Sequence, residues 1–368
     1  METAFHLESY LNDGVENIIS SILKATLCNP RESFFMTNYT AQSKRSSKLR
    51  QEAQKRGLHI PPFLIASITT QCNLHCKGCY ARANHSCYDR EPAANTRPFL
   101  RAEQWGNIFQ QAADLGVGFI LLAGGEPFLR RDVLTIAGKY SNILFPVFTN
   151  GTMIDPDYLD LLDQKRNVIP IVSIEGKQET TDARRGTGIY QRLHYAMQEL
   201  HNRGLLFGAS VTVTKKNMDE VLFDSFVSEL SASGCKAIIY VEYVPIDRQT
   251  IDLALDDEAR ALMAQRLDDR RKSYPELLML SFPGDEKSSG GCLAAGRGFF
   301  HINASGGAEP CPFSPYSDIN VVDTSLLEAL QSPLFQKLQQ GSLLQDHIGG
   351  CVLFEQEEQV KLLLKDPT

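Results

Sequence analysis

The sequence predicts an α/β fold, a partial (β/α)6 barrel of the TIM type, because apolar strand-like runs alternate with helix-like segments along residues 60–245. Six runs have this character: Phe63–Thr69, Gly118–Ala123, Ile143–Thr149, Val168–Ile174, Leu206–Thr214 and Ala237–Val244. Each is apolar along nearly its whole length, which is typical of parallel strands in a sheet covered by helices. Eight such units would close a barrel, so six predict an open one.

The rest of the chain divides around this core. Helices are expected between the strands, at Ala102–Leu115, Val133–Tyr140, Pro156–Lys165, Tyr190–Asn202 and Asp219–Ser231. Upstream, an apolar stripe at helical spacing predicts an amphipathic helix over residues 5–26, ended by Asn29-Pro30, and a second, polar helix is expected over Ala41–Arg56. The expected domains are an N-terminal helical extension (1–59), the barrel core (60–285) and a small cysteine-containing domain (286–368).

Charge and composition exclude several classes of protein. The net charge of −7 argues against a nucleic-acid-binding surface. No apolar run reaches the roughly 18 residues of a membrane span, and the N-terminus lacks a signal-peptide pattern. We therefore expect a cytoplasmic protein whose nine cysteines are thiols or metal ligands. The basic side chains of Ala41–Arg56 are interpreted as a solvated helix face, with a docking surface for an acidic partner as the alternative.

Three cysteines follow the first predicted strand at a Cys-x3-Cys-x2-Cys spacing: Cys72, Cys76 and Cys79. Fe–S clusters are usually held by Cys thiolates, and a loop this short can wrap three corners of an iron–sulfur cube. With no fourth ligand in the motif, one iron stays open for a substrate or cofactor. The alternatives are a zinc site or free thiols, although zinc sites usually pair two Cys-x2-Cys units or add histidines.

This triad resembles the signature of the radical S-adenosylmethionine (AdoMet) superfamily at every cysteine. The residue before the last cysteine is often aromatic in that family, whereas here it is Gly78, with Tyr80 just after the motif. The resemblance implies a [4Fe–4S] cluster whose open iron chelates the amino and carboxylate groups of AdoMet, with Tyr80 in the cofactor site. It also implies one-electron cleavage to a 5′-deoxyadenosyl radical, with an electron donor such as flavodoxin or ferredoxin.

The second predicted strand ends in Gly124-Gly125-Glu126-Pro127. Ligands of parallel barrels bind where the strands end, and two glycines let the backbone approach a ligand closely. The carboxylate of Glu126 suits the amino group of an amino-acid ligand. The stretch matches the Gly-Gly-Glu-Pro motif of the same superfamily, which implies that Gly124, Gly125 and Glu126 hold the AdoMet amino group.

Polar residues also end the third and fourth predicted strands. Ser173, followed by Arg185, resembles a Ser-Ile-Asp-Gly…Arg-Gly pattern of the superfamily, with Glu175 where Asp is usual. The resemblance implies that Ser173 and Arg185 hold the AdoMet carboxylate, for which the planar fork of Arg is well suited. Arg184 is close enough in sequence to be confused with Arg185. Thr149-Asn150-Gly151 is interpreted first as a family-like turn, with Asn150 facing the cofactor as the further expectation.

The C-terminal region carries Cys292, Cys311 and Cys351, with the first two in a Cys-x13-Gly-x4-Cys arrangement. This resembles the start of a SPASM extension without its dense later cysteines, a truncated form called a Twitch domain. The resemblance implies an auxiliary [4Fe–4S] cluster with these three ligands. The candidates for a fourth ligand are His347, Cys235, Cys28 or a substrate, and the alternatives are a structural zinc or no metal.

These observations predict a radical AdoMet enzyme, of oxidoreductase or lyase type, that abstracts hydrogen from its substrate. A peptide or protein substrate is favoured by the Twitch-like region, and a small molecule is the alternative. The alternative of another class is a non-catalytic Fe–S or zinc scaffold or electron carrier, which would not cleave AdoMet. No residue can be assigned from the sequence as a substrate acid or base.

Overall fold

The fold is built on one open, nine-stranded sheet, seen in a computed structural model that describes residues 6–27, 29–89, 97–285, 289–344 and 351–365. The strand order is β7-β6-β5-β4-β3-β2-β1-β8-β9, with every neighbouring pair parallel except β8 and β9. The strands are β1 Phe63–Thr69, β2 Phe119–Gly124, β3 Phe145–Thr149, β4 Val168–Ser173, β5 Gly208–Val213, β6 Ala237–Glu242, β7 Leu278–Phe282, β8 His301–Ile302 and β9 Ala308–Glu309. The expected partial barrel is confirmed.

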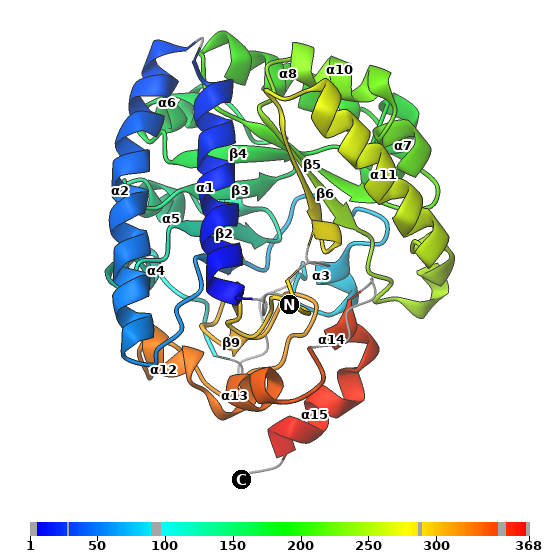
Figure 1. The fold of residues 1–368 in the computed structure, drawn as a ribbon. Coiled ribbons are helices and arrows are strands. Elements are labelled where there is room, and N and C mark those ends of the chain that lie inside the picture. The colour runs from blue at the N-terminus through cyan, green and yellow to red at the C-terminus, as the bar shows by residue number, and fades with distance from the viewer. Residues whose placement is uncertain (1–5, 28, 90–96, 286–288, 345–350, 366–368) are drawn as a thin grey trace, which may run out of the picture.

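Helices cover the outer face of the sheet (Figure 1). They are α4 Ala102–Leu115, α5 Arg131–Ala137, α6 Pro156–Gln164, α7 Gln178–Arg185, α8 Ile189–Asn202, α9 Met218–Val221, α10 Asp224–Ala232 and α11 Asp257–Ser273. The fully buried Trp105 and Phe109 of α4 pack in one apolar cluster with Ile120 and Leu122 of β2. The strand β7, which pairs with β6, was not predicted from the sequence.

The N-terminal helices α1 (Leu7–Ala25) and α2 (Pro30–Lys55) differ from the prediction at their junction. Asn29-Pro30 starts α2 as well as separating it from α1, so α2 begins well before the expected Ala41. The Asn29 side chain accepts the N–H groups of Arg31 and Glu32, and proline at the first helical position needs no hydrogen-bond donor. The pair is therefore an N-terminal cap.

Helix α1 packs on the inner face of the sheet, opposite the outer helices. Its Val15, Ile19 and Ile22 share an apolar cluster with Phe119 and Ile169, which alternate with the outward-facing strand residues. These strand residues lie near the beginnings of β2 and β4. The part of the barrel interior near these strand beginnings is thus filled by α1, which lies in front of the strands in Figure 1.

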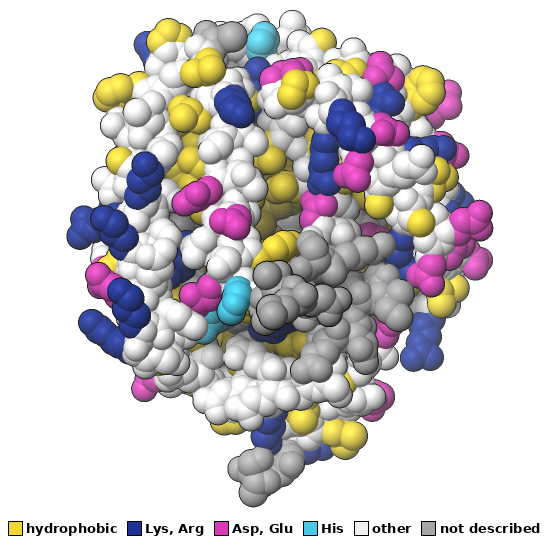
Figure 2. Space-filling view, in the orientation of Figure 1, with side chains coloured by type: hydrophobic (Ala, Val, Ile, Leu, Met, Phe, Trp, Pro, Cys, Tyr) yellow, Lys and Arg dark blue, Asp and Glu magenta, His cyan; other side chains and the backbone are white. Residues whose placement is uncertain are grey.

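The basic side chains of α2 divide into two groups. Arg50 is only 7% exposed and donates to the Gly116 carbonyl at 2.7 Å and to Asn12 Oδ1 at 2.9 Å, so it fastens α2 to the fold. Basic side chains gather at the left of Figure 2, on the side where Figure 1 shows α2. The exposed basic residues of α2 and its C-terminal end are Lys44, Arg45, Lys48, Lys55 and Arg56. The described helices include none that is long and apolar enough to cross a membrane.

The C-terminal region closes against the free edge of β1. Strand β8 pairs with β1 through Ile65 and Ala66, and β9 turns back on β8. Four further helices follow: α12 Leu326–Leu330, α13 Pro333–Gln340, α14 Val352–Glu355 and α15 Glu357–Lys365. This region therefore stands directly beside the strand that leads into the cysteine loop.

Arg166 offers a test of how the N-terminal helices are held. Its guanidinium pairs with the buried Glu32 of α2 and with Asp163, and it donates to the Gly204 carbonyl at 3.2 Å. Burial raises the pKa of Glu32, against the opposing effect of Arg166. We expect Arg166→Ala to lower the free energy of unfolding by about 3 kcal/mol, because it leaves a buried carboxylate without its cation.

Urea denaturation measures this effect, with Arg31→Ala as the matched control. Arg31 pairs with the same Asp163, but its side chain is 73% exposed. An exposed ion pair contributes little, so the control is expected to change stability by less than about 0.5 kcal/mol. Equal losses in the two variants would contradict the role assigned to the buried pair.

Candidate functional site

The three predicted cluster cysteines lie together on the loop between β1 and the short helix α3 (Tyr80–Ala83). Cys72, Cys76 and Cys79 are all partly buried. Burial raises the pKa of the Cys72 thiol, and the negative charges of Glu126, Cys76 and Cys79 raise it further. The thiols are therefore close enough to repel one another when ionised, and a positively charged group between them would stabilise the thiolates.

The Gly124-Gly125 turn is joined directly to the cysteine loop. The Gly125 N–H donates to the Thr69 carbonyl at 2.9 Å, and the Glu126 N–H donates to the Gln71 carbonyl at 2.8 Å. A Cβ atom at Gly124 would lie 2.2 Å from the Thr69 oxygen, and one at Gly125 would lie 2.0 Å from the Gln71 oxygen. Both glycines are thus required by the packing of the two loops, in addition to any ligand.

The Glu126 carboxylate is buried inside the fold. Its carboxylate is 1% exposed and accepts three hydrogen bonds, from the Phe128 N–H at 3.0 Å, the Thr149 hydroxyl at 2.7 Å and the Asn150 N–H at 2.7 Å. Burial raises its pKa against these three donors. Through these bonds Glu126, which follows β2, fastens the turn after β2 to the end of β3.

Asn150 and Tyr80 both flank the cysteine loop. The Asn150 side-chain amide donates to Asn73 Oδ1 at 2.7 Å and lies 3.9 Å from the Cys72 sulfur. Tyr80 is the first residue of α3, and its ring meets Phe313 of the C-terminal region edge-on, with centroids 4.8 Å apart. Tyr80 therefore connects the cysteine loop to the C-terminal region.

Glu175 holds both candidate arginines. The Arg185 Nε donates to Glu175 Oε1 at 2.9 Å, and Arg184 Nη1 and Arg185 Nη2 reach the same oxygen. The Thr212 N–H donates to the other oxygen at 3.2 Å, and the residue is 1% exposed. The structure therefore makes Glu175, which the sequence marked only as a departure from Asp, the centre of this part of the site.

The two arginines then take different positions. Arg185 Nη1 lies 4.0 Å from the Cys76 sulfur, whereas Arg184 Nε donates to the Lys77 carbonyl at 3.1 Å. Burial alone would lower the pKa of Arg185, but the charges of Glu175 and Cys76 raise it overall. Ser173, at the end of β4, is partly buried. Arg185 is thus the arginine that directs its charge at the cysteines, and Arg184 anchors the loop backbone.

Tyr243 is a neighbour of the cysteine loop that sequence reasoning missed. Gly78 has a φ of +66°, and a Cβ atom there would lie 2.7 Å from the Tyr243 hydroxyl oxygen. Tyr243, which follows β6, therefore fills the space into which a side chain at position 78 would project. No local signal could have found it, because the contact joins distant parts of the chain.

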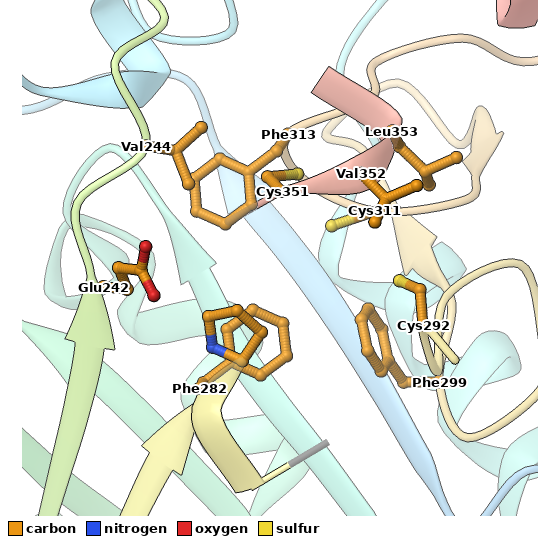
Figure 3. A pocket seen from close by; sticks show the side chains of 11 residues that line it. Glu242, Val244, Phe282, Cys292, Phe299, Cys311, Phe313, Cys351, Val352 and Leu353 are labelled. Atoms are coloured by element: carbon orange, nitrogen blue, oxygen red, sulfur yellow. The ribbon is translucent and has the colours of Figure 1, made fainter. Parts of the chain in front are cut away.

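The three C-terminal cysteines line one pocket, shown in Figure 3. Around Cys292, Cys311 and Cys351 its wall is largely apolar: Val244, Phe282, Pro283, Phe299, Phe313, Val352 and Leu353, with Glu242 at one side. Among the candidates for a fourth ligand, Cys235 is 2% exposed in the core and donates to the Ala237 carbonyl. His347 and Cys28 lie outside the described residues. Within the described ranges, no three His, Cys, Asp or Glu side chains are arranged to hold a single metal ion.

Curated relatives share sequence with most of the chain. AdoMet-dependent heme synthase of Methanosarcina barkeri (strain Fusaro / DSM 804) is 26% identical over 79% of this chain and 88% of its own length. Fe-coproporphyrin III synthase of the same organism is 28% identical over 53% of this chain, and the sporulation killing factor maturation protein SkfB of Bacillus subtilis (strain 168) is 25% identical over 73%. The chain spans 51% and 65% of the lengths of these last two.

A solved structure and a family model agree with these relatives. Streptococcus suis SuiB, in a crystal structure with bound S-adenosylmethionine, superposes with a TM-score of 0.67 at 18% identity, covering 88% of this chain and 79% of SuiB. Residues 66–223, which contain the cysteine loop and the Gly124-Gly125 turn, match the Radical SAM superfamily model. Residues 66–223 therefore carry a radical SAM domain, and the chain is similar in sequence to the maturation protein SkfB and in fold to SuiB.

Proposed function

We propose that this enzyme binds a [4Fe–4S] cluster and AdoMet at the cysteine loop and modifies a peptide or protein substrate. One observation carries the cofactor assignment: the loop of three thiols is hydrogen-bonded to the Gly124-Gly125 turn and lies within 4.0 Å of Arg185. When bound, the two cofactors supply reductive cleavage of AdoMet and a 5′-deoxyadenosyl radical that abstracts hydrogen from the substrate. A reduced flavodoxin or ferredoxin is the proposed electron donor.

The donor set on the loop fits such a cluster. Three thiolates are the ligands that Fe–S clusters take, and Cys72, Cys76 and Cys79 supply them from one loop. Burial raises the pKa of Cys76, whereas the charges of Arg185 and Arg184 lower it. The arginines therefore favour the ionised form that iron requires.

The AdoMet-binding roles are assigned to the backbone and side-chain groups that remain available to contact a ligand. The Gly124-Gly125 backbone, which has no side chain to block it, is proposed to hold the amino group. Ser173 and Arg185 are proposed to hold the carboxylate, with Asn150 and Tyr80 bordering the cofactor. Glu126 supports this site from behind, because its carboxylate is engaged with β3. Glu175 positions Arg185 in the same way.

An auxiliary [4Fe–4S] cluster is proposed for the pocket of Cys292, Cys311 and Cys351. The structure brings these three residues from separate segments to one apolar pocket, as cluster ligands require. Zinc, or no metal, is the alternative occupant. Phe313, which lines this pocket, contacts the ring of Tyr80, and this aromatic contact connects the pocket to the first cysteine loop.

The peptide substrate is supported by the relative SkfB, which is named as a maturation protein of sporulation killing factor. A second candidate, a small molecule of tetrapyrrole type, is favoured by one specific observation. The AdoMet-dependent heme synthase is matched over 88% of its own length and 79% of this chain. Binding assays with reconstituted protein, comparing iron coproporphyrin with candidate precursor peptides, separate the two.

Loss of the cluster is tested by Cys76→Ala. We expect anaerobically reconstituted, dithionite-reduced protein to convert AdoMet to 5′-deoxyadenosine, and the variant to fall to background because the third thiolate is missing. Liquid chromatography of the nucleoside measures this. Cys87→Ala is the matched control, since Cys87 is a buried thiol of the following segment and is expected to leave turnover intact. No 5′-deoxyadenosine from wild-type protein with an intact cluster would instead favour a non-catalytic scaffold.

Iron content tests the second cluster independently. The wild-type chain is expected to hold about eight irons and Cys311→Ala about four, because each [4Fe–4S] cluster has four iron atoms. Iron and sulfide analysis after reconstitution gives both numbers. Cys235→Ala, in the core, should keep the wild-type value. About four irons in the wild-type chain would mean that the C-terminal pocket holds no cluster.

Glu175→Gln tests the support of Arg185. The neutral amide cannot balance two guanidinium groups, so Arg185 is expected to lose its position and AdoMet affinity to fall about 10- to 100-fold, as for other supporting residues of cofactor sites. Equilibrium dialysis of AdoMet with reconstituted protein measures the change. Glu220→Gln is the control, because Glu220 holds the other end of α7 through Lys177 and Thr180. An equal fall in AdoMet affinity in both variants would mean that Glu175 only holds α7 in place and does not position Arg185.

A further inference from the structure

A row of three polar side chains crosses from the C-terminal region to β1, outside the cofactor site described above. His301 of β8 pairs through Nδ1 with the Glu309 carboxylate of β9 at 2.7 Å, and through Nε2 with the Ser67 hydroxyl of β1 at 2.8 Å. His301 is 3% exposed and Glu309 is 5% exposed. Burying a carboxylate and an imidazole is costly, so their retention here calls for a reason.

Ser67 is the end of this row that faces the barrel interior. Ala66 and Ile68 are fully buried on the helix-covered side of β1, so Ser67 points to the opposite, inner side, where it keeps partial exposure. Its register partner on β2 is Ala123, which directly precedes Gly124. The Ser67 hydroxyl therefore lies on the inner wall beside the proposed AdoMet turn.

The other end of the row is held firmly. The Asn303 side-chain amide donates to the second oxygen of Glu309 at 2.6 Å, and its Oδ1 accepts the N–H groups of Ser305 and Gly307. A carboxylate fixed in this way sets the orientation of the imidazole and stabilises its charged form. A carboxylate, an imidazole and a hydroxyl in this order, each at hydrogen-bond distance, are the parts of an activated hydroxyl.

The attachment of β8 to β1 does not require the side-chain row. The Ile65 N–H donates to the Phe300 carbonyl at 2.9 Å, and the two strands pair through Ile65 and Ala66. Ile302, beside His301, adds a fully buried apolar contact. Backbone pairing and apolar packing therefore hold this edge, which leaves the polar row available for chemistry.

We propose that Ser67, His301 and Glu309 form a proton relay for a substrate that loses a proton during its conversion; this rests on the function proposed above. The substrate's proton passes to the Ser67 oxygen as the Ser67 proton passes to His301 Nε2. One proton moves from substrate to imidazole, and no electron is transferred. Glu309 keeps its charge throughout and stabilises the imidazolium.

Covalent labelling of the holoprotein tests the relay without a known substrate. Diisopropyl fluorophosphate reacts with activated serines: the Ser67 oxygen would bond to phosphorus, fluoride would leave, and the proton would pass to His301. We expect one adduct by intact-mass spectrometry, mapped to Ser67 by peptide sequencing. Ser67→Ala should abolish it, and His301→Asn should slow it by about 100-fold, the usual contribution of a general base.

Ser210→Ala is the matched control, because Ser210 is the register partner of Ser173 on the sheet and should leave labelling unchanged. Thermal unfolding of each variant checks that it is folded. If a variant is unfolded, the presence or absence of the Ser67 adduct on wild-type protein still tests the relay. Absence of a Ser67 adduct would overturn the relay, because a substrate must be able to reach Ser67 just as the reagent does. Equal labelling rates in wild type and His301→Asn would also overturn it, because His301 would then not activate the Ser67 hydroxyl. Labelling requires no AdoMet cleavage, so its failure is distinguishable from failure of the proposed function.

Discussion

The close approach of two backbone turns is the constraint on which the whole site depends. The cysteine loop has little regular structure of its own, and it is held where the Gly124-Gly125 turn presses against Thr69 and Gln71. Side chains at either glycine would overlap backbone atoms, which cannot move aside as flexible side chains can. The same two glycines therefore seat the thiols, and in the function proposed above they also present an open backbone to AdoMet.

Buried carboxylates organise the rest of the site from behind. Glu126 accepts hydrogen bonds from Phe128 and from the end of β3, and Glu175 holds Arg184 and Arg185 against the cysteine loop. Each carboxylate is satisfied by several partners, which offsets the cost of removing it from water. In the proposed cofactor site the groups left to contact AdoMet are backbone, hydroxyl and guanidinium, and the two carboxylates position them.

The two ends of the chain divide the barrel interior. Helix α1 covers the inner face near the beginnings of the strands, with Val15 and Ile19 among the contacts, whereas the cofactor residues follow the strand ends. The C-terminal region adds β8 to the edge at β1 and brings its cysteine pocket beside Tyr80. The interior near the strand ends, where Ser67 lies, is therefore the place in which the proposed substrate chemistry would occur.

The sequence by itself determined the parallel barrel, the cysteine loop and the glycine turn, because periodicity and short-range spacing are local properties. It missed β7 and the early start of α2, where the pattern is short or polar. Only the tertiary structure decided which arginine faces Cys76, that Glu126 is turned inward, and that Tyr243 and His301 lie near the site. Those positions depend on contacts between residues far apart in the chain, and the packing of strands and loops alone brings them together.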